Sequence, residues 1–193
     1  MMVKNLLALI GALVLVVAIG GYAKFGGMIS KAQSLDAGAM PAYMNMFTQV
    51  LESGDPAKAM MKEFEVQEDV ENADVIESIK ALAEEYNMRV VGDTKMFNIP
   101  DAKPEQVKFV ENVSLCSLYI AKKFLNHSRY FGGFMPCRIM LVEYGNGKRY
   151  LRTMDLQLAI HGGFPLPPEM LELATKVKTA MDEIPARAAK GDF

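Results

Sequence analysis

The sequence is poor in the residues and motifs on which most enzymes depend. Its two cysteines lie about twenty residues apart, which is too far for a CxxC redox pair, and they match no four-ligand zinc pattern. GxSxG, P-loop, HExxH, dinucleotide-binding and CxxCH motifs are all lacking. No basic run exceeds two residues and the formal net charge is -2, so the concentrated basic surface of a nucleic-acid-binding protein is not expected. These absences favour a non-enzymatic protein with no nucleic-acid partner.

One long apolar run stands at the N-terminus. Residues 5–23 contain no charged side chain. As a helix they would span roughly 28 Å, close to the hydrocarbon thickness of a bilayer. We therefore predict a transmembrane signal anchor over residues 1–27. Its expected lipid-facing residues include Leu6, Leu9, Leu13, Val16 and Ile19.

The alternative to an anchor is a cleavable signal peptide. Gly21-Tyr22-Ala23 offers small residues before a cleavage point, but the apolar run exceeds the usual length of a signal-peptide core. In either case the N-terminal position predicts export of the rest of the chain. The anchor would leave a single-pass protein in a bacterial inner membrane with its C-terminal domain in the periplasm, whereas cleavage would give a secreted protein.

Residues 28–61 are predicted to form a tether followed by an amphipathic helical pair. The tether should begin at Gly26-Gly27 and include the small residues of 32–39. A helix opening at Met40-Pro41 and ending at Gly54-Asp55-Pro56 would gather one apolar face, which must pack on the domain, on a partner or on lipid headgroups. This face consists of Met40, Tyr43, Met44, Phe47 and Leu51. A second short helix should carry Met60, Met61 and Phe64.

The methionines of the first of these helices admit two interpretations. Met40, Met44 and Met46 form a spaced cluster of thioethers of a kind that accepts Cu(I). Their helical spacing, shared with Tyr43 and Phe47, instead favours packing in a core or an interface.

Residues 62–193 are predicted to form an α+β domain. A helix should begin with a capping arrangement at Asp74, and strands are expected near 88–96 and 107–113. Ser114 or Ser117 can cap the next helix, whose predicted inward residues are Leu118, Ala121, Phe124 and Leu125. The order strand, helix, strand, strand, helix, hairpin, helix predicts a two-layer domain with a mainly antiparallel sheet packed against helices.

The C-terminal third has two distinctive local signals. Residues 137–144 and 149–154 are β-formers that flank Gly145-Asn146-Gly147, a sequence typical of a hairpin turn. The last helix should start in the proline-rich stretch 165–168 and stop at Pro185.

The two cysteines are the first candidate site residues. Cys116 is predicted at a strand-to-helix junction, where a helix N-terminus would favour its thiolate, and Cys137 begins a strand. A disulfide between them would close a loop of about 20 residues and contribute about 3 kcal/mol to stability. Two packing thiols, or a metal, haem or sulfur-species site, are the other possibilities.

The two histidines, His127 and His161, each lie near glycines that permit close approach of a ligand. A copper or haem site would combine Cys116 and Cys137 with one histidine, because thiolate and imidazole suit these metals. The alternative is that His127 caps a helix end and His161 forms a hydrogen bond in a loop. No cofactor is firmly implied, and copper and haem remain candidates.

The segments around the cysteines resemble the family called domain of unknown function 302 (DUF302). They are Leu115-Cys116-Ser117 with Ala121 and, about twenty residues later, Pro136-Cys137-Arg138 before the hairpin. Thr153-Met154-Asp155 and Gly191-Asp192-Phe193 resemble an exported subgroup, and the likeness covers residues 62–193. It implies a two-layer α+β fold and association into dimers, but no established reaction. The commoner motif is Cys-Asn-Pro, so a function of that asparagine would not transfer to this chain.

Two hypotheses of function follow. In the first, the chain is a non-enzymatic, membrane-anchored periplasmic binding or accessory protein that forms a homodimer or joins a membrane complex. In the second, Cys116 and Cys137 serve a periplasmic redox, metal, haem or sulfur-species binding module.

Overall fold

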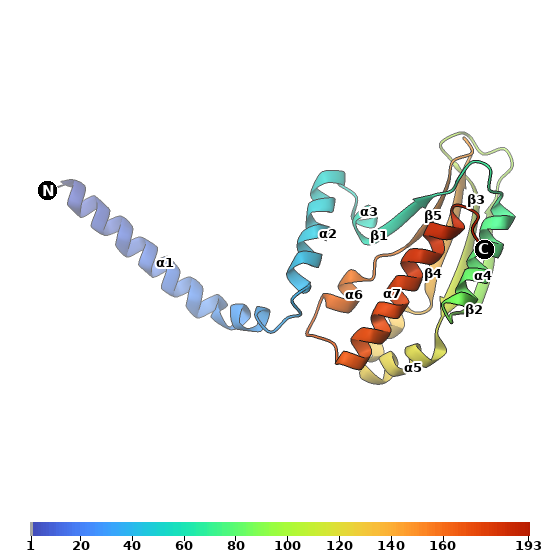
Figure 1. The fold of residues 1–193 in the computed structure, drawn as a ribbon. Coiled ribbons are helices and arrows are strands. Elements are labelled where there is room, and N and C mark those ends of the chain that lie inside the picture. The colour runs from blue at the N-terminus through green and yellow to red at the C-terminus, as the bar shows by residue number, and fades with distance from the viewer. Residues whose placement is uncertain (1) are drawn as a thin grey trace.

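The structure, a computed structural model, describes residues 2–193, so that Met1 of the predicted anchor lies outside the described residues. It begins with α1 (Met2–Ala32), a long helix that projects from the rest of the chain (Figure 1). Lys4–Ala32 is long and apolar enough to cross a membrane. The connection is shorter than the predicted tether, because the helix continues through Gly26 and Gly27 and only residues 33–38 link it to the next helix. Glycine weakens a helix by only about 1 kcal/mol and does not break it.

A helical pair follows after a short connection. α2 spans Ala39–Ser53 and ends at Gly54, whose φ of 67° is left-handed, as the predicted stop requires. α3 spans Pro56–Met60, and its first N–H groups donate to the side chain of Asp55. The second helix is shorter than predicted, because Met61–Glu65 forms strand β1 instead. Pairing of β1 with a strand far along the chain overrides the local helical pattern.

The sheet has five strands in the order β1-β5-β4-β3-β2, and every neighbouring pair is antiparallel. The remaining strands are β2 (Arg89–Asn98), β3 (Val107–Cys116), β4 (Cys137–Tyr144) and β5 (Arg149–Met154). The predicted hairpin is confirmed, and Gly147 in its turn has a φ of 81°. The mainly antiparallel α+β architecture is confirmed as well.

The other helices are α4 (Asn72–Glu85), α5 (Leu118–His127), the 3-10 helix η1 (Arg129–Phe134), α6 (Gln157–His161) and α7 (Pro168–Ala188). α4 starts earlier than predicted, so Asp74 lies in its first turn rather than at its cap. α7 continues through Pro185, where a stop was predicted. Leu118 and Leu125 are exposed rather than inward-facing, and only Phe124 of α5 is buried.

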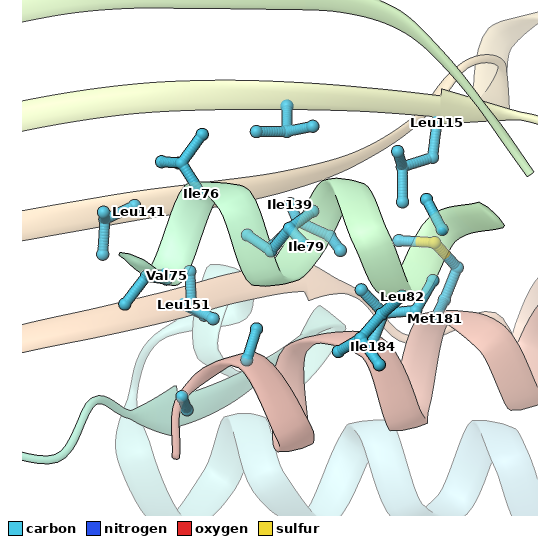
Figure 2. Packing of buried hydrophobic residues seen from close by; sticks show 14 of the residues in the cluster. Val75, Ile76, Ile79, Leu82, Leu115, Ile139, Leu141, Leu151, Met181 and Ile184 are labelled. Carbon is cyan, nitrogen blue, oxygen red and sulfur yellow. The ribbon is translucent and has the colours of Figure 1, made fainter. Parts of the chain in front are cut away.

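The core lies between one face of the sheet and the helices α4 and α7. Ile79 and Leu82 of α4, Ile139 of β4 and Met181 and Ile184 of α7 meet in this layer (Figure 2). Because side chains alternate along a strand, Ile139 and Leu141 point into the core. We call the face of the sheet that packs against α4 and α7 the covered face, and the other face of the sheet the open face. Among residues 2–193, the helices in substantial contact with the strands are α4, α7 and, where it joins β1, α3.

Candidate functional site

The structure places the two cysteines on neighbouring strands. Cys116 is the last residue of β3 and precedes Ser117 at the start of α5, so the predicted strand-to-helix junction is confirmed. Cys137 is the first residue of β4, where it pairs in register with Leu115 rather than with Cys116. Strand alternation directs side chains one residue apart toward opposite faces. Both cysteines are free thiols, so the disulfide is not formed.

Burial controls the ionisation of both thiols. It raises the pKa of Cys116, which is the opposite of the direction expected from a helix N-terminus. Burial and the nearby Cys116 raise the pKa of Cys137 to about 11. Both side chains are therefore protonated at neutral pH. Thiolate chemistry finds no support in this arrangement.

The two histidines lie apart from the cysteines. His127 is the last residue of α5, and its ring centroid is 6.3 Å from that of Phe131. His161 is the last residue of α6, and its Nδ1 lies 2.9 Å from Asp36 Oδ1. Within residues 2–193, no group of three or more His, Cys, Asp or Glu side chains could hold a metal ion. The structure therefore does not assemble the predicted cysteine–histidine set for copper or haem.

Asp36 and His161 belong to a group of five residues in mutual contact, which we call the Asp36 latch. The group consists of Asp36, Tyr43, His161, Gly162 and Gly163. The N–H of Asp36 donates to Gly163 O at 2.9 Å, and the Tyr43 hydroxyl donates to Gly162 O at 2.8 Å. The hydrogen bond from the N–H of Gly38 and the contact with His161 lower the pKa of the Asp36 carboxyl, although desolvation partly opposes them. The latch holds the start of α2 against the end of α6.

Sequence reasoning missed this latch because its two sides lie 125 residues apart. One local signal was available in Gly38. A Cβ atom at this position would come within 3.0 Å of the His161 ring, so a glycine permits the close approach.

A cleft of about 590 Å³ lies beside the latch, between α2 and α6. Methionine and small apolar residues dominate its lining, with a few polar groups. The lining includes Pro41, Ala42, Asn45, Met46, Met60, Phe134, Met154, Gln157 and His161. The volume and the apolar lining are in the range of small-molecule sites.

A second hollow, of about 270 Å³, lies at the end of the sheet where β4 begins and β5 ends, and residues of both faces line it. Five sulfur-containing residues line it: Cys137, Met61, Met140, Met154 and Met181. Arg138 and Arg152 also line it. The thioethers suit a soft metal, whereas the two positive charges disfavour any cation.

The middle of the open face carries two buried polar atoms without a hydrogen-bond partner. They are Asn112 Oδ1 and Arg152 Nε. Asn112 pairs with Met140, and Met140 pairs with Arg152, so the three residues form one row across β3, β4 and β5. We call it the central row. Unpaired buried polar atoms cost about 1–3 kcal/mol each, so they mark a place where a partner would gain by supplying hydrogen bonds.

A family model for the domain of unknown function DUF302 matches residues 62–187. The chain belongs to the DUF302 family. It is also similar in fold to the crystal structure of an uncharacterized conserved DUF302 protein from Bacillus stearothermophilus, with 13% identity and a TM-score of 0.50. That match covers 67% of this chain and 98% of the other. No curated protein matches the chain.

The DUF302 region contains all four predicted site residues, Cys116, Cys137, His127 and His161. It also contains the central row. α2 and Asp36 lie outside it, so the latch joins the DUF302 domain to a preceding segment that the family model does not cover.

Proposed function

We propose that this DUF302 protein is a non-enzymatic, membrane-anchored accessory protein whose domain binds a protein partner through its open face. In this proposal α1 is a single span of the bacterial inner membrane and the domain is periplasmic. The partner is a second copy of the chain. The observation that carries the proposal is the central row, where Asn112 Oδ1 and Arg152 Nε have no hydrogen-bond partner.

The central row is suited to a symmetric interface. Neighbouring strands are about 4.8 Å apart, so Asn112 and Arg152 lie at similar distances on either side of Met140. When two copies meet face to face around a twofold axis parallel to β4, Asn112 of one copy faces Arg152 of the other. An amide oxygen then meets a guanidinium N–H, after small rotations of two partly exposed side chains. This is the self-complementarity that an isologous dimer requires.

Existing contacts leave this pairing available. Arg152 uses its Nη2 atom to bind Glu63 at 2.5 Å, and its Nε remains unpaired. Asn112 uses its Nδ2 to donate to Ser114 at 3.1 Å, and its Oδ1 remains unpaired. Both atoms are covered in the single chain, so a dimer would satisfy them after small side-chain rotations expose them.

The test is the mass of the full-length protein in mild detergent, measured by light scattering. We expect a dimer for the wild type and a monomer for Met140→Glu, which places two carboxylates against each other at the centre of the interface. Met96→Glu, at a half-exposed residue of the edge strand β2, is the matched control and should remain dimeric. A wild-type protein that is monomeric without a co-purifying subunit contradicts the proposal, and a complex with another subunit replaces the homodimer by a membrane complex.

A second candidate is a sulfur-ligand site in the hollow at the end of the sheet. The meeting of Cys137 with Met61, Met140 and Met154 supports it, because thioethers and thiols suit Cu(I). We rank this candidate second, because the thiol is protonated and the two arginines disfavour binding of a cation. Native mass spectrometry and optical spectra of the purified protein test it. Bound copper or haem absorbance that disappears in Cys137→Ser would favour it, and a protein that binds neither would exclude it.

A further inference from the structure

α2 carries an apolar stripe that no other part of residues 2–193 covers. Met40, Met44, Phe47 and Leu51 are each at least 54% exposed. Their spacing of three and four residues places them on one side of the helix. Ala42 and Met46 lie elsewhere on α2 and line the cleft against α6. α2 therefore has an inner side that packs toward the DUF302 domain and an outer apolar side.

The composition of α2 is unusual for a helix in water. Residues 39–51 contain no charged side chain, and Glu52 is the first. The surface helices of soluble domains normally present charged side chains to solvent. An exposed stripe of methionine, phenylalanine and leucine instead suits the boundary between lipid headgroups and acyl chains.

The position of α2 relative to α1 points to the same environment. Only residues 33–38 separate the end of α1 from the start of α2. Figure 1 shows that α2 runs across the line of α1 rather than continuing it. If α1 spans the bilayer, the six connecting residues keep the start of α2 within about 20 Å of the end of α1, and therefore near the membrane surface.

The Asp36 latch fixes this arrangement to the domain. Asp36 and Tyr43 bind the chain at 161–163, so α2 is held against α6 on its inner side. Phe164, which follows the latch directly, is 65% exposed and adds an apolar side chain near the same junction. If α1 lies in the bilayer, lipid is an apolar surface close to this outer stripe.

We propose that α2 is an interfacial helix, which lies on the membrane surface with Met40, Met44, Phe47 and Leu51 inserted among the lipid headgroups. Through the Asp36 latch it sets the orientation of the DUF302 domain relative to the bilayer. This inference rests on the proposed anchoring by α1, since a chain without a membrane span would not hold α2 at the surface. Lipid is the occupant of the stripe, and the open face of the sheet remains available for the second copy.

The protein contains no tryptophan, so single tryptophans can report their own depth in the membrane. The full-length chain is reconstituted into phosphatidylcholine vesicles that carry bromine at a shallow or a deep acyl position. Phe47→Trp and Met44→Trp report on α2, and Leu13→Trp reports on α1. Phe97→Trp on β2 is the matched control, because Phe97 is a similarly exposed aromatic residue of the domain.

We expect shallow bromine to quench the emission of both α2 variants at least about twofold more than that of Phe97→Trp. Leu13→Trp should be quenched most by deep bromine. If Leu13→Trp is quenched and both α2 variants behave like Phe97→Trp, the interfacial helix is overturned while the anchor stands. If Leu13→Trp is not quenched either, the proposed anchoring itself fails. Thermal melts of all four variants verify that the domain remains folded.

Discussion

The two faces of the sheet use the same strands for different purposes. On the covered face Ile139, Leu141 and Leu151 are fully buried beneath α4 and α7. On the open face the intervening residue Met140 is only partly buried. The covered face therefore contributes most of the hydrophobic stabilisation, and the open face remains able to bind another surface.

The polar groups of the two faces differ in the same way. On the covered side Asp182 of α7 binds Lys62 at 2.5 Å and Lys178 at 2.7 Å, and Glu143 binds Lys108 at 2.7 Å. On the open face Asn112 and Arg152 each keep one unpaired buried atom. The third such atom, Asn72 Oδ1, lies at the first residue of α4. The charged groups on the covered side thus largely have partners within the chain, whereas two polar atoms of the central row have none.

Truncating neighbouring residues of β4 should separate the faces most clearly. Leu141→Ala removes a fully buried side chain and should lower the free energy of unfolding by about 3 kcal/mol. Met140→Ala, one residue away on the open face, should cost less than about 1 kcal/mol in the monomer. Denaturant titration of both variants, at a protein concentration low enough to keep them monomeric, measures the difference. Equal losses would mean that the open face is covered in the isolated chain.

The ionisation of Asp182 should make the free energy of unfolding depend on pH. Burial alone would raise the pKa of its carboxyl, but the hydrogen bonds from Lys178 and Lys62 outweigh this and lower the pKa below 3.8. The ionised carboxylate therefore stabilises the fold above the unfolded-state pKa of 3.8, and this contribution is lost as the pH falls through the lower pKa of the folded state. Asp182→Asn should cost about 1 kcal/mol at neutral pH.

Denaturant titrations of wild type and Asp182→Asn between pH 7 and pH 2 measure this effect. The difference between the two proteins should shrink as the pH falls below 3.8. Glu172→Gln is the control, since Glu172 forms an exposed ion pair with Lys176 within one helix. A pH-independent cost of Asp182→Asn would contradict the prediction, because it would show that the ionisation of the carboxyl does not contribute the stability.

Glu111 also lies on the covered face, but the effect of pH on its contribution to stability should be opposite to that of Asp182. Burial raises the pKa of its carboxyl above 4.5, and the neighbouring Asp93 adds to the rise. The stability linked to this group is fully present below pH 4.5 and is lost as the pH rises through the folded-state pKa. Glu111→Gln keeps the size and the hydrogen-bonding capacity without the charge. It should be more stable than wild type at pH 8, by less than about 1 kcal/mol, and no more stable at pH 4. Denaturant titration at the two pH values checks this, and a variant that is less stable at pH 8 would contradict it.

Features encoded locally could be predicted from the sequence, and features that depend on distant contacts could not. The hairpin was predictable because the turn needs a glycine such as Gly147 at a positive φ. β1 was mistaken for helix because its strand identity comes from pairing with β5, about ninety residues further along the chain. Pro185 does not stop α7 because its side chain is fully buried beside Ile184, and packing offsets the lost backbone hydrogen bond.

The candidate site also combines features that are encoded locally with features that depend on distant contacts. The position of Cys116 between β3 and α5 followed from local pattern, but its protonation depends on burial by the folded domain. The hydrogen bond predicted for His161 is present, yet its partner Asp36 lies in a different segment of the chain. The unpaired atoms of Asn112 and Arg152 depend on the register of three strands, which no local pattern specifies.

The smallest expected effect concerns the open face itself. Asn112→Leu replaces the amide with an apolar group of the same shape, and removes both the unpaired Oδ1 atom and the hydrogen bond to Ser114. Because the first change stabilises and the second destabilises, the monomer should gain about 0.5 kcal/mol. The dimer should nevertheless weaken, because Arg152 of the partner copy would lose its acceptor. Thr179→Val, at an exposed position of α7 away from the open face, should change neither quantity. Denaturant titration and light scattering of each variant separate the two effects. A monomer destabilised by more than about 1 kcal/mol would mean that Asn112 Oδ1 is already satisfied in solution, and the contrast between the two faces would then rest on packing alone.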